Sequence, residues 1–255
     1  MKLNYKILGQ GEPLIIIHGF LGMLDNWMTP AHMLEDRFRC IVPDMRNHGR
    51  SPHSSEHTYA AMVQDVLQLM DHLGLNSAHF IGHSMGGKVA MRLAQLHPGR
   101  LKKLVVVDIG PKSYPPHHQQ IFEALESVPL DQLKKRTDAD PYLARYISDP
   151  AVRQFLMKNL HRTEQGGYAW RFNLPVLKEA MQNIGEAMDM DYYSGETLFV
   201  RGGKSDYITD EDWADIKVIF PEAHLITIEN AGHWVHAEQP DEFIQVVRDF
   251  LSPEV

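Results

Sequence analysis

The sequence has little cysteine, no excess of positive charge and no long apolar run, and each scarcity excludes a class of protein. One cysteine, Cys40, among 255 residues rules out an intrachain disulfide, and its apolar neighbours predict a small buried side chain. Lys and Arg number 25 against 33 Asp and Glu, a formal net charge of −8. This balance argues against nucleic acid or an anionic membrane as the main partner, since both require a basic face.

The apolar runs are too short to cross a bilayer. Stretches such as residues 14–17 and 104–107 have the length of a buried strand, so no membrane span is predicted. Lys2 and Lys6 stand near the N-terminus, but no apolar stretch follows them, so no secretion signal is expected. These features predict a soluble, cytoplasmic protein.

What the sequence does contain is an alternation of short β-branched runs with helical patterns. Such an alternation is typical of an α/β protein, with a mostly parallel central sheet covered by helices on both faces. Helical spacing of apolar residues marks segments 59–73, 85–96 and 241–251. The strand-like runs are residues 13–17, 39–43, 78–81, 103–108, 197–200 and 224–228, with 2–8 as a candidate edge strand.

The alternation stops between residues 111 and 194. This stretch is rich in helix formers, is interrupted by several prolines and by Gly166-Gly167, and has no comparable strand-like run. It is therefore predicted to be a helical insertion. The expected organisation is a core domain of residues 1–110 and 195–255, with the insertion occupying residues 111–194.

A serine stands where a strand-like run gives way to a helical pattern, in the pentapeptide GHSMG at residues 82–86. So short a connection forces Ser84 into a strained backbone and lifts its side chain clear of the sheet edge, while the flanking glycines leave room for the bend. This predicts a nucleophile elbow. The Met85 N–H at the helix start would face an oxygen above Ser84, where the helix dipole adds positive charge.

A serine hydroxyl needs a base, and position along the chain selects one of the 15 histidines. His233 lies in the loop between the last strand-like run and the final helix, where the chain order Ser, acid, His puts the base. His236 lies three residues on, but with no further ligand cluster no metal is expected. The loop HGFLG at residues 18–22 is expected to supply a second oxyanion donor, the N–H of Phe20, because its glycines allow close approach.

These motifs, together with DMRNHGRS at residues 44–51 and GHWVHAEQPDEF at 232–243, resemble the α/β-hydrolase superfamily over nearly the whole chain. More narrowly the chain is similar to the YbfF-type esterases. That match depends on Asn47, where most of the superfamily has glycine, on VDIGP at 107–111, and on WRFNLPVL at 170–177. The resemblance implies a carboxylic ester hydrolase without metal or organic cofactor. It also implies a helical cap over the active site, inserted after the sixth strand, which corresponds to residues 111–194.

Two aspartates compete to orient the histidine. Asp206 follows the seventh strand, where most of the superfamily keeps its acid, and it fits a G-x-x-D pattern counted from Gly203. Counted back from the apolar Ile208, however, the usual acid position falls on Ser205, one residue earlier. Asp108 ends the preceding strand at the edge that faces the crevice. The YbfF-type subfamily is similar in drawing its acid from that strand, so Asp108 is preferred and Asp206 stays as the alternative.

The predicted function is a serine carboxylesterase that hydrolyses small acyl esters through an acyl-enzyme intermediate. Trp170 and Phe172 are predicted to contact the substrate. Within the same fold the alternatives are an acyl thioesterase or another hydrolase or lyase with this triad. From another class, the alternative is a ligand-binding signalling protein with negligible turnover. The expected partner is a small-molecule acyl ester or thioester, and no oligomeric state is predicted.

Overall fold

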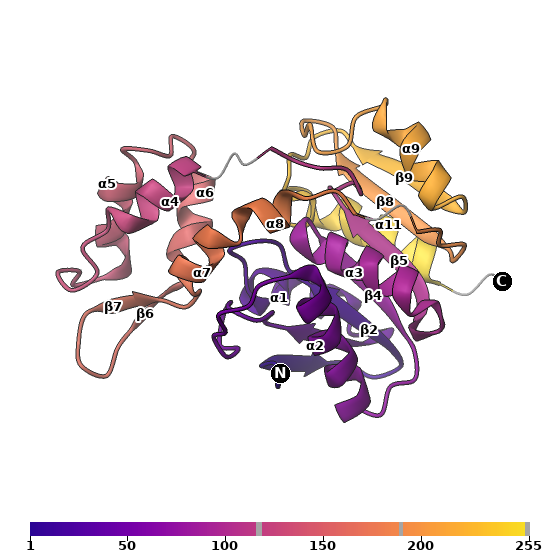
Figure 1. Cartoon of the computed structure of the whole chain (residues 1–255), viewed down its shortest axis with the longest axis horizontal. Coiled ribbons are helices and arrows are strands. Elements are labelled where there is room, and N and C mark those ends of the chain that lie inside the picture. The colour runs from indigo at the N-terminus through magenta and orange to yellow at the C-terminus, as the bar shows by residue number, and fades with distance from the viewer. Residues whose placement is uncertain (116–118, 189–190, 253–255) are drawn as a thin grey trace.

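The computed structural model describes residues 1–115, 119–188 and 191–252, and its centre is a seven-stranded, mostly parallel sheet (Figure 1). The predicted α/β architecture is confirmed. The strands lie in the order β1-β3-β2-β4-β5-β8-β9, and only β1 runs antiparallel to its neighbour. They are β1 Tyr5–Leu8, β2 Glu12–Ile17, β3 Phe38–Pro43, β4 Ala78–His83, β5 Leu101–Val107, β8 Thr197–Gly202 and β9 Ala223–Ile228.

Helices cover both faces of this sheet because successive strand residues point to opposite sides. In β2, Ile15 and Ile17 pack into one cluster with side chains of α2, α3 and α9. Leu14 and Ile16 pack into a second cluster with side chains of α1 and α11. The core helices are α1 Met28–Leu34, α2 Tyr59–His72, α3 Met85–Leu96, α9 Asp212–Ile219, α10 Val235–Glu238 and α11 Pro240–Leu251.

The segment between β5 and β8 extends to one side of the sheet (Figure 1). Its helices are α4 Gln119–Glu126, α5 Asp140–Leu143, α6 Pro150–Met157, α7 Leu174–Glu179 and α8 Met181–Gly185. Most of its buried apolar side chains, Phe122, Leu125 and Leu177 among them, form a third cluster, which Leu21 joins from the core. The division into core and cap at residues 111–194, a range that includes the undescribed residues 116–118 and 189–190, stays a prediction.

Two expectations about this segment are wrong. It is not free of strands, because β6 Leu160–Arg162 pairs antiparallel with β7 Tyr168–Trp170. Gly166 and Gly167, with φ of 88° and 77°, make the turn, and three-residue strands are too short to register as an alternating pattern. The segment also follows the fifth strand of the chain and not the sixth, because β1 is the only described strand that precedes β2.

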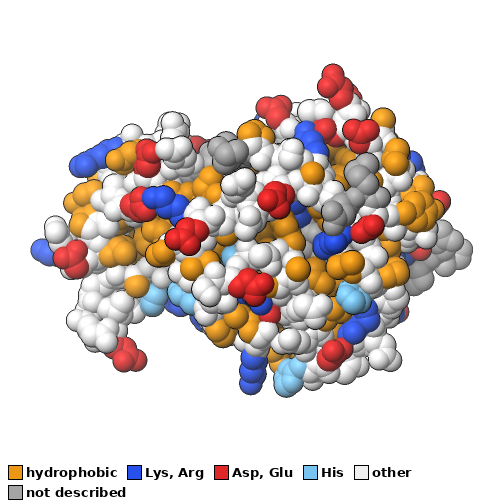
Figure 2. Space-filling view, viewed as in Figure 1, with side chains coloured by type: hydrophobic (Ala, Val, Ile, Leu, Met, Phe, Trp, Pro, Cys, Tyr) orange, Lys and Arg blue, Asp and Glu red, His pale blue; other side chains and the backbone are white. Residues whose placement is uncertain are grey.

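Composition leads to two expectations for the described residues, the lack of a membrane span and the lack of a basic face. No helix in the described ranges is both long and apolar enough to cross a membrane. On the face that Figure 2 shows, basic side chains are scattered among acidic ones. A polyanion would therefore meet no continuous basic surface on that face.

Candidate active site

The carboxyl edge of the sheet holds four non-glycine residues with positive φ. They are Leu21, Asn47, Ser84 and Asp108, with φ of 57°, 64°, 51° and 49°, in the loops after β2, β3, β4 and β5. No other non-glycine residue in the described chain has positive φ. Such backbone conformations persist only where the surroundings enforce them, and they concentrate at functional sites. The candidate site is built around these four loops.

Ser84 occupies the junction between β4 and α3, with φ 51° and ψ −118°. Its N–H donates to the Val107 carbonyl at 3.0 Å, which ties the turn to the neighbouring strand. A Cβ at Gly82 would overlap the Gly86 carbonyl oxygen, and one at Gly86 would overlap the carbonyl oxygen of Ile17. The two glycines therefore let the first turn of α3 pack directly on the strand ends.

Met85 is the first residue of α3, so its N–H has no acceptor within the helix. The positive end of the helix dipole lies at the same place, beside Ser84. Phe20, the other expected oxyanion donor, lies in the loop after β2 and lines the same cavities as Ser84. The structure thus brings both expected donor residues to the serine.

Asp108 is fully buried directly after β5 and its carboxylate accepts three hydrogen bonds. His233 Nδ1 lies 2.7 Å from Oδ2, the Ser205 hydroxyl donates to the same oxygen, and the Gly202 N–H donates to Oδ1 at 3.1 Å. Because Nδ1 carries the proton shared with this carboxylate, Nε2 is the imidazole nitrogen left to act toward the cavity that Ser84 and His233 both line.

A stacked ring fixes the imidazole of His233, and a hydrogen bond fixes its backbone. The Tyr207 ring stacks on it with centroids 3.9 Å apart and planes 18° apart. His83 Nε2 donates to the His233 carbonyl at 2.9 Å, so the His83 ring is held beside the loop that carries the base. Burial lowers the pKa of His83 well below its usual range, so it acts here as a neutral donor.

Asp206 lies elsewhere. Its side chain is exposed, and within the described part of the chain no hydrogen bond or ion pair joins it to His233. Ser205, which stands where the superfamily count puts an acid, instead donates to Asp108. The structure therefore places Asp108 against the histidine and leaves Asp206 outside the arrangement.

The loop that carries Phe20 is held in place by buried polar contacts. Leu21 N–H donates to His48 Nε2 at 3.1 Å, and Asn159 Nδ2 donates to the Leu21 carbonyl at 2.9 Å. His48 accepts at Nε2 because its Nδ1–H donates to the Arg46 carbonyl at 2.9 Å. Burial, with smaller contributions from neighbouring histidines, lowers the pKa of His48 well below its usual range and keeps it in this accepting form.

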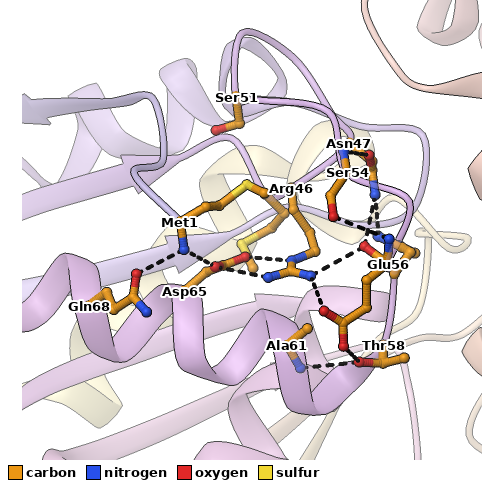
Figure 3. Close-up of polar contacts among 12 residues, drawn as sticks. Met1, Arg46, Asn47, Ser51, Ser54, Glu56, Thr58, Ala61, Asp65 and Gln68 are labelled. Atoms are coloured by element: carbon orange, nitrogen blue, oxygen red, sulfur yellow. Dashed lines mark hydrogen bonds and ion pairs between the residues drawn. The ribbon is translucent and has the colours of Figure 1, made fainter.

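The loop that carries His48 is in turn fixed by an ion-pair network at the start of α2 (Figure 3). Arg46 Nε lies 2.6 Å from Asp65 Oδ2, and Arg46 Nη1 lies 3.2 Å from Glu56 Oε2. Asn47 Oδ1 accepts from the Ser54 N–H at 2.7 Å. Asparagine tolerates the left-handed backbone that this position adopts, with φ of 64°, and its side chain adds this anchor.

Ser84 lies in the wall of two cavities, which also share Phe20. The first has an apolar wall of cap side chains and also contains His233. The second contains Met85, Lys88 and three tyrosines. The cap residues of the first wall, which the sequence did not single out, are Ile121, Val152, Phe155 and Leu156.

Trp170 and Phe172, predicted to contact the substrate, are not among the residues that line these two cavities, and their contact with substrate stays a prediction. Their rings stack on each other, with centroids 5.3 Å apart, inside the hydrophobic cluster of the cap. They are buried by packing because they lie at and just after the end of β7, beneath the cap helices. Sequence alone gave no signal of which cap aromatics point inward.

No group of three or more His, Cys, Asp or Glu among the described residues has the geometry of a metal site. The groups that the structure gathers are a strained serine, a histidine and a buried carboxylate, with backbone N–H groups beside them. Such a set can activate a hydroxyl and stabilise an oxyanion.

Comparison with known proteins gives consistent matches over the whole chain. Residues 12–240 match the sequence model described as the alpha/beta hydrolase fold. The chain is 37% identical to Esterase YbfF of Escherichia coli strain K12, over 99% of this chain and 100% of that protein. It is 38% identical to sn-1-specific diacylglycerol lipase ABHD11 of Mus musculus, over 99% of this chain and 86% of that protein. A solved marine microorganism esterase superposes with a TM-score of 0.95 at 42% identity, covering 98% of this chain and 99% of its own.

Proposed function

Because this chain belongs to the α/β-hydrolase fold family and is a carboxylic ester hydrolase, we propose that it cleaves small acyl esters through an acyl-enzyme on Ser84. The observation that carries the proposal is the 2.7 Å contact between His233 Nδ1 and the buried Asp108, beside a cavity that Ser84 also lines. This contact fixes the tautomer in which Nε2 is free to accept a proton.

The reaction follows from these positions. His233 Nε2 takes the proton of the Ser84 hydroxyl as its oxygen attacks the ester carbonyl, and Asp108 stabilises the imidazolium that forms. The N–H groups of Phe20 and Met85 stabilise the tetrahedral oxyanion. His233 then protonates the leaving alcohol, and water repeats the sequence to release the acid.

In this proposal the core supplies the chemistry, and the cap, residues 111–194, sets the range of substrates. The cap side chains Val152 and Phe155 form part of the apolar wall beside His233. An apolar wall binds an apolar chain by removing it from water, at about 25 cal/mol per Å². Acyl thioesters offer the same carbonyl to the same groups and serve as comparison substrates.

The test is turnover of p-nitrophenyl esters and acyl-coenzyme A thioesters of graded chain length by the wild type and by Ser84→Ala. Removing the nucleophile of such a unit costs about 10⁶ in kcat. Ser127→Ala removes a cap hydroxyl whose bond among the described residues is to the Ala124 carbonyl, so it is the matched control and should keep wild-type activity. Retention of a tenth of the activity by a folded Ser84→Ala variant would show that Ser84 is not the nucleophile.

A further inference from the structure

The second cavity beside Ser84 contains a buried cation that the proposed reaction does not use. Lys88 lies one turn along α3 from the serine, and its backbone N–H donates to the Ser84 carbonyl at 3.1 Å. The residue is only 1% exposed. Ser84 and Lys88 both line the second cavity. Tyr59 and Tyr114, whose rings lie against the ammonium group, line the same cavity.

The contacts of this ammonium group are all with uncharged partners. Lys88 Nζ donates to the carbonyls of Lys112, at 3.0 Å, and Glu186. The rings of Tyr59 and Tyr114 lie 5.9 and 5.0 Å away, within the range of cation–π attraction. Among the described residues no carboxylate lies within ion-pair distance of Nζ.

Within the described ranges, two of the three N–H donors of the Lys88 ammonium group have hydrogen-bond acceptors, both of them carbonyls. The nearby tyrosine hydroxyls are engaged in other bonds, since Tyr59 donates to the Ile184 carbonyl at 2.9 Å and Tyr114 to the Tyr207 carbonyl at 2.7 Å. A buried charge without a counter-ion is costly, so an anion that entered this cavity would be stabilised by Lys88.

The position of His233 decides which part of an ester would lie there. The general acid must reach the leaving oxygen, and His233 lines the first cavity but not the second. The alcohol therefore leaves toward the first cavity. The acyl chain is left with the second cavity, where Met85 and Lys88 lie.

We propose that Lys88 binds a carboxylate at the far end of the acyl chain, so that this esterase prefers monoesters of dicarboxylic acids. The proposal rests on Ser84 being the nucleophile. In a protein of net charge −8, which repels anions in general, such a preference requires a local cation in the site.

Lys88 also joins the two ends of the cap, because Lys112 precedes α4 and Glu186 follows α8. Its replacement can loosen the cap and lower all activity. The readout is therefore the ratio of kcat/KM for a charged ester to that for a neutral ester of matched shape, measured on one variant at a time. Monoethyl glutarate and ethyl pentanoate form such a pair, with released ethanol measured by gas chromatography.

The wild type should favour monoethyl glutarate by about 10- to 100-fold, the contribution expected of one charge-assisted hydrogen bond. Lys88→Met should abolish the preference, mainly through KM for the charged ester, and Lys88→Arg should keep much of it. Lys178→Met makes the same change of charge and removes a cap ion pair with Glu126 outside both cavities, so it is the matched control for a loosened cap. Its preference should equal that of the wild type.

The pH dependence of the ratio gives a readout that a purely structural lysine would not change. Burial lowers the pKa of Lys88 to about 8, opposed by the charge of Glu186. Above that pH the ammonium loses its proton, so the preference should fall as pH rises through about 8. The facing tyrosines do not titrate there, because burial raises the pKa of Tyr59 and Tyr114 and raises that of Tyr207 to about 12.

Four results would overturn the proposal. A wild type that cleaves ethyl pentanoate without favouring monoethyl glutarate would leave Lys88 as a fastening of the cap only, with the serine mechanism intact. A Lys88→Met variant that kept the preference would likewise show that Lys88 only holds the cap in place. A Lys88-dependent preference for the acetate ester of γ-hydroxybutanoate over butyl acetate would put the carboxylate on the alcohol side instead. Failure of both the charged and the neutral ester, without covalent labelling of Ser84, would overturn the proposed function as well.

Discussion

The carboxyl edge of the sheet and the cap are built in opposite ways. The edge holds four strained non-glycine residues and several fully buried polar groups, among them His18, His48 and Asp108. In the described part of the cap only glycines have positive φ, and the interior is an apolar cluster. Strain of this kind costs about 1–3 kcal/mol per residue and is kept where geometry matters more than stability. The difference supports the proposal that the reacting groups lie at the edge of the sheet.

The two regions meet at two of the strained residues. Leu21 joins the hydrophobic cluster of the cap and is bonded through its carbonyl to Asn159. The Asn47 carbonyl accepts from the Asn173 N–H at 2.9 Å. The loops after β2 and β3 therefore contact both regions. A shift of the cap would displace the loop that carries Phe20, because Leu21 is bonded to the cap.

The largest expected effect separates two carboxylates of the core. Asp108→Asn should lower kcat by about 10⁴, because an amide no longer fixes the His233 tautomer or stabilises its imidazolium. Asp206→Asn should cost less than about tenfold, since Asp206 is exposed and acts only through its field. Both variants are assayed with p-nitrophenyl esters after thermal unfolding shows that they are folded. A dead Asp206→Asn with a nearly normal Asp108→Asn would reverse the assignment.

A smaller effect separates two aromatic residues of the cap. Phe155→Ala enlarges the first cavity and should change by about tenfold the preference among esters graded in alcohol chain, the value of one to two methylene contacts. Trp170→Phe alters the buried stack with Phe172, so it should lower the melting temperature and leave the profile unchanged. A profile shifted by Trp170→Phe and not by Phe155→Ala would support the substrate contact of Trp170 predicted from the sequence.

The smallest effect per residue concerns the buried histidines of the edge. Burial lowers the pKa of His48 well below its usual range and that of His57 to about 4, so the unfolded chain binds protons that the folded chain does not. Stability should therefore fall as pH drops below about 6.5, by at most about 1.4 kcal/mol per pH unit for each histidine.

Urea unfolding at several pH values between 7 and 5 measures this loss. His48→Gln, whose side-chain oxygen can still accept from the Leu21 N–H, should show a shallower decline than the wild type. If the free energy of unfolding fell equally steeply with pH in both proteins, protonation of His48 would not contribute to the loss of stability.

The sequence was most informative where a residue's role depends on its own neighbourhood. The core strands follow from β-branched runs, helices α2, α3 and α11 follow from helical spacing, and the turn at Ser84 follows from its flanking glycines. Counted back from Ile208, the usual acid position falls on Ser205, and in the structure Ser205 donates to Asp108. Lys88 and the cap wall were missed, because tertiary packing decides which of many ordinary side chains face a cavity.

The central claim is that the sheet edge performs the chemistry through a covalent bond to Ser84. Acid quenching within the first turnover of a p-nitrophenyl ester, followed by peptide mass spectrometry, tests it most directly. The account predicts one acyl group on Ser84, absent from Ser84→Ala and formed far more slowly in Asp108→Asn. An active wild type that carries no acyl group, or carries it on another residue, would contradict the account.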